Sequence, residues 1–249
     1  MTRMGVIIVT GGSQGIGAAV CRGAAARGWD VCLSYSRGQA EAEAVVAGIE
    51  AAGGRALAVQ ADAADGDAVA RLFQAASGLG RVTALVNNAG ITGPLATIDA
   101  LDAAGLDRVL AVNVRGAFLA VQEAVRCMAT DLGGAGGAIV NVSSRASQLG
   151  GSGEWVHYAA SKGFVDTLTL GAARELAPRG IRVNAVLPGL IDTAIHAKAG
   201  QQDRVARMAA SIPMGRAGTA DEVAETILWL LSDQASYVTG AILSVSGGR

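Results

Sequence analysis

The sequence is poor in aromatic residues and proline, and it contains no long apolar run. Aromatic side chains make up 4% of the 249 residues, so aliphatic side chains supply nearly all of the 51% hydrophobic content. The longest apolar runs, residues 6–9 and 227–231, are too short to span a membrane or to act as a secretory signal. The net charge is −1 and no basic run occurs. We therefore expect neither a membrane nor a nucleic-acid partner.

Cysteine, histidine and lysine are also scarce. Cys21, Cys32 and Cys127 are widely spaced, odd in number and set among apolar residues, which favours small core residues over disulfides or redox chemistry. A reducing cytoplasm fits this use of cysteine best. His157 and His196 form no ligand cluster, so we expect no metal site. Lysine supplies only two of the twenty basic residues, and one of the two is Lys162.

Glycine, in contrast, is abundant. Thirty-five glycines with four prolines indicate many tight junctions between elements of a compact α/β domain. The length is at the upper end of what one hydrophobic core supports, so we expect a single domain over residues 1–249.

Apolar patterns along the chain predict an alternation of strands and helices. We expect strands at 5–10, 30–36, 55–61, 82–86, 138–142, 181–187 and 239–245. Helices are expected up to residue 27, at 39–52, 65–78, 158–177 and 219–231, with two more within 99–132. Residues 194–216 interrupt this rhythm, and we interpret the segment 190–216 as a substrate lid.

A glycine-rich turn follows the first strand. Its residues Gly11, Gly12, Ser13, Gln14, Gly15, Ile16 and Gly17 lead directly into a helical pattern. In such a strand–turn–helix unit the glycines bring backbone N–H groups and a helix N-terminus against a pyrophosphate. The spacing is not that of Gly-x-Gly-x-x-Gly, and a tight turn without a ligand is the alternative.

The second strand is followed by Ser36 and Arg37, where dinucleotide sites often have an acid that holds the ribose. An acid would repel a 2′-phosphate, whereas Arg37 can pair with it and Ser36 can donate to it. The sequence therefore favours NADP(H) over NAD(H). The alternative is that Arg37 is a solvated loop residue.

Polar residues follow other predicted strands, where the ligand crevice of a parallel sheet opens. Asp62, beside Ala63, is expected either to accept from an adenine amino group or to cap the next helix. The fourth strand ends in Asn87, Asn88, Ala89 and Gly90, and the fifth in Ser143 and Ser144. Asn113 interrupts an apolar helical pattern, which indicates either a kink or a site.

Tyr158 and Lys162 are four residues apart and therefore lie on one face of a helix. An ammonium about 4 Å from a phenol, at an effective dielectric of about 20, is worth up to about 4 kcal/mol. That interaction would lower the pKa of Tyr158 toward the range useful for general acid–base catalysis. A surface pair of no catalytic importance is the alternative.

Taken in order, these motifs resemble those of the short-chain dehydrogenase/reductase superfamily. The matching residues span positions 10 to 193 and are Thr10, Gly11, Gly15, Ile16, Gly17, Asn87, Asn88, Ala89, Gly90, Asn113, Ser144, Tyr158, Lys162, Pro188, Gly189 and Thr193. Within the superfamily the sequence looks most like bacterial 3-oxoacyl-carrier-protein reductases and glucose dehydrogenases. The resemblance implies one Rossmann-type doubly wound domain with a seven-stranded parallel sheet, helices on both faces, and a homotetramer.

The resemblance also implies roles by position. Tyr158 would exchange a proton with the substrate oxygen, Ser144 would hydrogen-bond to that oxygen, and Lys162 would bind the nicotinamide ribose while lowering the pKa of Tyr158. Asn113 would hold a water molecule of a proton relay. The remaining cofactor contacts are expected from Asn88 at the adenosine-side ribose, and from Thr193, the Ile191 backbone and the Pro188-Gly189 turn around the carboxamide.

One departure from the family concerns the loop between Ser144 and Tyr158, which is one residue longer than in common members. We expect Ser144 to remain the second hydroxyl donor, with Ser143 on the opposite face of the strand and Ser147 as a lesser candidate. His157 is interpreted as a residue of the pocket wall or rim, with a catalytic role as the alternative.

The expected function is an NADP(H)-dependent oxidoreductase acting on a small carbonyl or alcohol substrate. Two rivals remain, a catalytically silent NADP-sensing regulator on the same fold and an NAD-preferring sugar or alcohol dehydrogenase. A regulator would be expected to lose Tyr158, Lys162 or Ser144, and all three are present. The loop residues Leu149, Trp155, Val156, Ile195 and Met208 suggest a moderately apolar substrate.

Overall fold

The computed structural model describes residues 4–193 and 203–249. Seven parallel strands form one sheet in the order β3-β2-β1-β4-β5-β6-β7. The strands are β1 (Val6–Val9), β2 (Asp30–Tyr35), β3 (Ala56–Gln60), β4 (Val82–Asn87), β5 (Gly137–Val142), β6 (Ile181–Pro188) and β7 (Ile242–Val245). The predicted seven-stranded, doubly wound fold is therefore confirmed.

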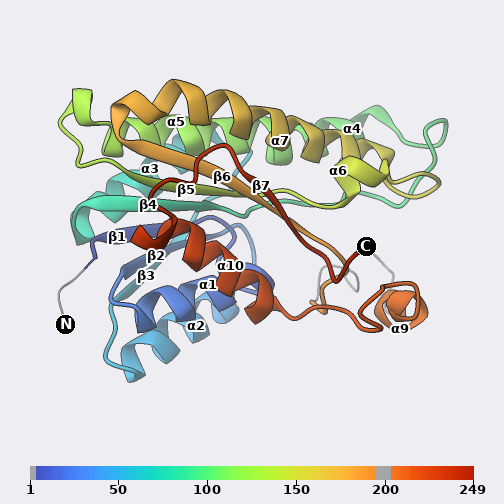
Figure 1. Cartoon of the computed structure of the whole chain (residues 1–249), viewed down its shortest axis with the longest axis horizontal. Coiled ribbons are helices and arrows are strands. Elements are labelled where there is room, and N and C mark those ends of the chain that lie inside the picture. The colour runs from blue at the N-terminus through green and yellow to red at the C-terminus, as the bar shows by residue number, and fades with distance from the viewer. Residues whose placement is uncertain (1–3, 194–202) are drawn as a thin grey trace.

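Helices cover both faces of the sheet (Figure 1). One face carries α1 (Gly15–Ala26), α2 (Gln39–Ala51) and α10 (Ala220–Leu231). The other carries α3 (Gly66–Leu79), α5 (Ala117–Met128) and α7 (Val156–Leu176), with α4 (Ala103–Leu110) and α6 (Ala146–Leu149) nearer its end. The short helix α9 (Arg204–Ala209) lies away from the sheet, beyond the carboxyl end of the strands.

The first strand lies at the centre of the sheet and is buried along its whole length. Ile7 pairs with Val31 of β2 on one side and with Ala84 of β4 on the other. Because β2 and β3 extend the sheet in one direction and β4 to β7 in the other, the chain changes direction at β1. A crevice opens at the carboxyl ends of the strands at such a switch point.

Local signals explain where several helices begin. Thr219 and Glu222 form a capping box at the start of α10. Asp65 caps α3 by accepting from two backbone N–H groups of the first turn, so the alternative role of Asp62 as the cap of that helix is wrong. Asp62 instead accepts from the backbone N–H of Ala64, two residues on.

Three segments contain helical turns that the sequence did not predict. Between α4 and α5 the chain forms a π-helical turn over Ala111–Gly116, so the local conflict expected at Asn113 is a real irregularity of the helix. The loop before Tyr158 contains the short helix α6, and the segment interpreted as a lid contains α9. Residues 194–202 of that lid, with Ile195 and His196, lie outside the described residues.

The cysteines behave as core side chains. Cys21 and Cys32 are buried, and burial raises the pKa of both thiols, to about 12 for Cys32. Over 4–193 and 203–249 no cluster of three potential metal ligands occurs. Across the same described ranges, no helix has both the length and the apolar character that crossing a bilayer requires.

Candidate active site

A cleft of about 830 Å³ opens at the carboxyl end of the sheet. It is lined by nearly all of the predicted site residues, namely Gly11, Ser13, Gln14, Gly15, Ile16, Ser36, Arg37, Asp62, Ala63, Asn88, Ala89, Gly90, Ser144, Tyr158, Lys162, Pro188, Gly189, Ile191 and Thr193. Gly17 and Asn113 are the predicted site residues that do not line it. The glycine turn, the β2 end and the Tyr158 helix therefore meet at one cavity.

The glycine turn forms a cradle at the start of α1. Gly15 has a φ of +53°, and a Cβ built there would lie 3.4 Å from Thr193 Cγ2. A Cβ at Gly17 would lie 2.4 Å from the carbonyl oxygen of Gly11, so Gly17 allows the helix to approach the turn. The helix has neither a side-chain cap nor an acidic residue in its first turn. Such a helix N-terminus favours an anionic ligand.

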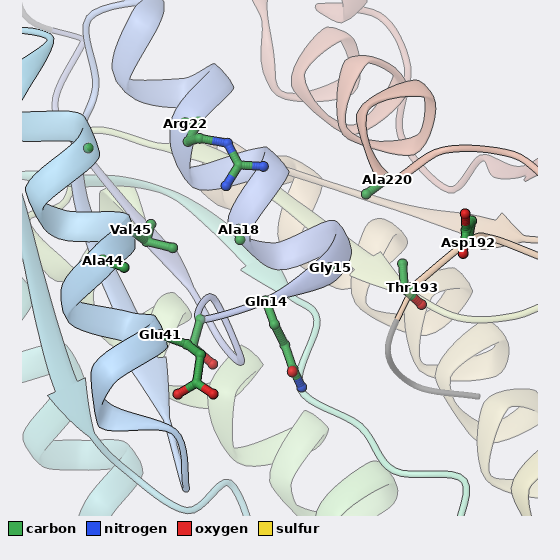
Figure 2. A pocket seen from close by; sticks show the side chains of 12 residues that line it. Gln14, Gly15, Ala18, Arg22, Glu41, Ala44, Val45, Asp192, Thr193 and Ala220 are labelled. Atoms are coloured by element: carbon green, nitrogen blue, oxygen red, sulfur yellow. The ribbon is translucent and has the colours of Figure 1, made fainter. Parts of the chain in front are cut away.

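A second hollow of about 510 Å³ lies behind the same turn, between α1 and α2. Figure 2 shows Gln14 and Gly15 at the start of α1 with Thr193 across from them, while Arg22 and Glu41 come from the two helices. Because Gln14, Gly15 and Thr193 line both hollows, the second adjoins the main cleft at the glycine turn.

The glycine turn is held in place by polar side chains of neighbouring strands. Asn88 uses Nδ2 to donate to the carbonyl oxygens of Thr10 and Gly11, at 2.9 and 3.0 Å. Thr10 Oγ1 accepts from the backbone N–H groups of Asn88 and Ala89. Ser34 Oγ accepts from the N–H of Gly11 at 3.1 Å. Sequence reasoning missed the support from Ser34, because only the β1–β2 pairing brings this serine to the turn.

The adenosine end of the cleft contains two arginines. Ser36 and Arg37 are exposed at the end of β2. Asp62 forms an ion pair with Arg108, with 2.9 Å between Oδ2 and Nη2. Despite partial burial, the backbone N–H of Ala64 and the Arg108 guanidinium hold the pKa of Asp62 below its usual value. Arg108 was not predicted from the sequence, because it reaches the cleft from α4.

Tyr158 and Ser144 meet at the other end of the cleft. Tyr158 is half-buried on the first turns of α7, and Ser144 follows β5. Burial raises the pKa of Tyr158, while a hydrogen bond with the Ser144 side chain lowers it, and the balance lies above the usual value. Ser144 Oγ also accepts from the N–H of Ala146 at 3.1 Å. The two hydroxyls predicted to flank the substrate oxygen are thus adjacent.

Lys162 is almost fully buried, with 5% of its surface exposed. Its Nζ donates to the carbonyl oxygen of Val142 at 2.7 Å and lies 5.8 Å from the centre of the Tyr158 ring. Burial lowers the pKa of Lys162 to about 8, and the nearby carboxylate of Asp166 opposes this effect.

The prediction that Lys162 lowers the pKa of Tyr158 below its usual value is wrong, because the pKa of Tyr158 is raised. Lys162 Nζ lies over the Tyr158 ring, 5.8 Å from its centre, and the desolvation of Tyr158 outweighs the lowering effect of Ser144. The phenol therefore retains its proton at neutral pH.

Neighbouring candidates have other partners. Ser143 is buried and donates to the carbonyl oxygen of Lys162 at 3.1 Å. Ser147 does not line the cleft, and its hydroxyl donates to the carbonyl oxygen of Ser144. His157 is also outside the lining, with Nε2 3.1 Å from the carbonyl oxygen of Thr92. These contacts leave Ser144 as the serine whose side chain acts on the pKa of Tyr158.

Asn113 lies behind the cleft, buried to 1% exposure in the π-helical turn. Its Oδ1 accepts from the N–H of Ile91, and its Nδ2 donates to the carbonyl oxygen of Ile91 and to Ser161 Oγ. Ser161 in turn donates to the carbonyl oxygen of Tyr158 at 2.7 Å. Asn113 therefore connects the cleft wall at Ile91 to α7, the helix that carries Tyr158, through hydrogen bonds.

The predicted apolar substrate wall is only partly present. Leu149 and Trp155 line the cleft, whereas Val156 and Met208 do not. Arg145 and Arg249, which the sequence did not single out, line it as well.

The residues present fit a nicotinamide dinucleotide. The uncapped start of α1 and the Gly15 cradle suit a pyrophosphate, and Ser36 and Arg37 suit a phosphate on the adenosine ribose. Tyr158, Ser144 and Lys162 offer two hydroxyls and a cation at the opposite end of the same cleft.

Comparison with known proteins agrees with this geometry. The model of the family described as Enoyl-(Acyl carrier protein) reductase matches residues 11–249. The uncharacterized oxidoreductase YgfF of Escherichia coli (strain K12) is 49% identical over 99% of this chain and 100% of its own. An L-rhamnose 1-dehydrogenase (NAD(P)(+)) of Sphingomonas sp. (strain SKA58) is 41% identical over 97% of this chain and 94% of its own.

Solved structures show the same arrangement. A short-chain dehydrogenase from Burkholderia cenocepacia J2315, solved in complex with NADP, superposes with a TM-score of 0.89. It is 37% identical, and the match covers 99% of this chain and 98% of that one. The chain therefore belongs to the short-chain dehydrogenase/reductase superfamily, and it is an oxidoreductase of that family.

Proposed function

We propose that the protein is an NADP(H)-dependent reductase of a small carbonyl compound, with Tyr158 as the proton donor. The observation that carries this proposal is that Tyr158, Ser144 and Lys162 line the same cleft as the glycine turn, with the Ser144 side chain acting on the pKa of Tyr158. Two adjacent hydroxyls are suited to meet the charge that develops on a carbonyl oxygen during reduction.

The cofactor would be held along the whole cleft. The N–H groups at the start of α1 bind the pyrophosphate, Arg37 and Ser36 bind a ribose 2′-phosphate, and Asn88 contacts the adenosine-side ribose. Pro188, Gly189, Ile191 and Thr193 form the remaining contacts, around the carboxamide. A bound nicotinamide supplies the hydride, and the protein supplies position and proton chemistry.

The protonation states of the chain's own residues suit reduction. Because the pKa of Tyr158 is raised, its hydroxyl is protonated at neutral pH and can donate to the substrate oxygen. Ser144 hydrogen-bonds to the same oxygen. Lys162, with a pKa of about 8, is mostly cationic at neutral pH and binds ribose hydroxyls beside the Tyr158 ring. Asn113 keeps the wall in register with α7, and the second acceptor position of its Oδ1 would hold the water molecule of the proton relay.

We further propose that residues 1–249 form one nucleotide-binding unit with 190–216 as its lid, and that the protein is a homotetramer. Exposed apolar side chains on the last elements support the second proposal. Trp229 is 40% exposed on α10, Leu243 is 39% exposed on β7, and Tyr237 between them is fully exposed. Apolar patches of this kind are typical of subunit interfaces. The cytoplasmic location stays a prediction.

A spectrophotometric assay at 340 nm with NADPH and NADH tests the proposal, on a panel of ketones, aldehydes, sugars and 3-oxoacyl thioesters. We expect kcat/KM to be about tenfold or more higher with NADPH. Arg37→Gln should lower the NADPH value by about 10- to 100-fold and leave the NADH value within about threefold, because a charge-assisted phosphate contact is lost.

Two results would contradict the proposal. Equal or better rates with NADH would favour the NAD-preferring dehydrogenase. Tight NADPH binding without turnover of any compound would favour the silent regulator.

A further inference from the structure

The adenosine end of the cleft contains one acid and two arginines. Asp62, Arg37 and Arg108 all line the cleft, and they come from three separate parts of the chain. Asp62 follows β3, Arg37 follows β2, and Arg108 lies on α4. Arg37 is the proposed ligand of the ribose 2′-phosphate. A carboxylate near that ligand opposes its role, because the carboxylate repels a phosphate and attracts the guanidinium.

The carboxylate of Asp62 is engaged by Arg108. Arg108 Nη2 donates to Asp62 Oδ2 at 2.9 Å, and the backbone N–H of Ala64 donates to Oδ1 at 3.0 Å. Both carboxylate oxygens therefore have a donor. The side chains of Arg108 and Asp62 are 44% and 40% exposed, and an ion pair this exposed adds little to stability. Stability therefore does not account for the pair.

Arg37, in contrast, remains available for a ligand. In the part of the chain that the structure describes, it has neither an ion pair nor a hydrogen-bond partner. Its charge nevertheless acts on Asp62. Burial raises the pKa of Asp62, but the N–H of Ala64, Arg108 and, last, Arg37 lower the pKa below its usual value. Asp62 thus lies within electrostatic range of both arginines and is paired with Arg108.

The fold holds Arg108 beside Asp62. The π-helical turn that continues α4 packs directly on the loop after β3, since a Cβ at Gly116 would lie 2.4 Å from the carbonyl oxygen of Ala63. Arg115 of the same turn donates to the carbonyl oxygen of Ala64. Arg108 is therefore carried by an element that is fixed against the loop of Asp62.

We propose that Arg108 is a specificity residue for the cofactor, which pairs with Asp62 and so prevents this acid from pairing with Arg37 or repelling the 2′-phosphate. The inference rests on the proposed function, which assigns the 2′-phosphate to Arg37. Arg108 acts through Asp62 and does not contact the phosphate. With Arg108 the two arginines and the aspartate have one net positive charge, and without Arg108 they have none.

Titration calorimetry with NADP+ and NAD+ tests the proposal. The ratio of the two Kd values measures the contribution of the 2′-phosphate, because contacts with adenine are common to both nucleotides. Arg108→Gln should lower the preference for NADP+ by about tenfold and leave the Kd for NAD+ within about threefold. Combining Arg108→Gln with Asp62→Asn should return the preference to within about threefold of the unchanged protein, because the net charge of the group is restored.

Two control variants accompany these measurements. Arg27→Gln breaks an exposed ion pair with Glu225 outside the cleft and should change neither Kd. Arg108→Lys keeps the charge and should keep most of the preference for NADP+. An equal loss of affinity for NADP+ and NAD+ in Arg108→Gln would overturn the proposal, because it would show a structural role. A double variant as impaired as Arg108→Gln alone would also overturn it, in favour of direct contact between Arg108 and the phosphate.

Arg37→Gln separates this inference from the proposed function. A preference for NADP+ that is lost in Arg37→Gln but kept in Arg108→Gln overturns the inference and leaves the proposed function standing. Equal affinity of the unchanged protein for NADP+ and NAD+ overturns both. A failure to reduce any carbonyl compound bears on the proposed function alone, because the Kd values are measured without a substrate.

Discussion

Replacing Lys162 by Met should stabilise the protein at neutral pH while removing a residue of the site. Burial lowers the pKa of Lys162 from 10.5 to about 8. One pKa unit corresponds to about 1.4 kcal/mol, so the lowered pKa means that the charged lysine destabilises the folded state by about 3 kcal/mol at neutral pH. Met fills a similar volume without a charge. The lost hydrogen bond to Val142 offsets about 1 to 2 kcal/mol of the gain.

The pH dependence gives the sharper test, because the methionine variant has no titratable group at position 162 whereas the unchanged protein has one. The unfolded chain binds more protons than the folded one between pH 8 and pH 10.5, so the stability of the unchanged protein rises with pH over that range. The advantage of Lys162→Met should therefore shrink by about 2 to 3 kcal/mol between pH 7 and pH 10.

Urea unfolding followed by circular dichroism at pH 7, 8, 9 and 10 measures this difference. Arg71→Met, which removes an exposed cation of α3, is the control and should show no such trend. The difference in unfolding free energy between the Lys162→Met variant and the unchanged protein should not stay constant. A constant difference from pH 7 to pH 10 would refute the conclusion that burial destabilises the charged form of Lys162.

Three further predictions concern the turn, the helices and the direction of the reaction. Gly15→Ala should lower the free energy of unfolding in urea by about 1 kcal/mol and weaken nucleotide binding in a fluorescence titration, because φ at Gly15 is +53° and the added Cβ approaches Thr193. Gly48 is the control. It lies in open space on α2, and Gly48→Ala should stabilise the folded protein by about 0.5 to 1 kcal/mol. Asp65→Ala should lower Tm by about 2 to 4 °C through loss of the α3 cap. In stopped-flow assays, alcohol oxidation should accelerate as pH rises from 7 to 10, because Tyr158 must lose its proton to act as a base and its pKa is raised. An oxidation rate independent of pH would contradict this.

Much of the fold and the site could be predicted from the sequence because their signals are local. The buried strand, the glycine turn and the Thr219 capping box each depend on residues close together in the chain, and each is present. The spacing of Tyr158 and Lys162 likewise fixes their common helix face.

What could not be predicted depends on pairing between distant segments. Ser34 supports Gly11 only because β2 lies beside β1, and Arg108 reaches Asp62 from another layer. The Arg145 and Arg249 contact joins residues more than a hundred positions apart. The pKa of Tyr158 was misjudged because spacing gives neither the direction of Lys162 Nζ nor the extent of burial.

The central claim is that the Tyr158 hydroxyl gives its proton to the substrate oxygen. The most direct measurement is the single-turnover rate of carbonyl reduction by Tyr158→Phe, with nucleotide binding measured on the same preparation. The account predicts nucleotide affinity within about threefold of the unchanged protein and a rate lower by about a thousandfold or more, given the usual contribution of general acid catalysis. An undiminished rate in a folded, nucleotide-bound variant would contradict it.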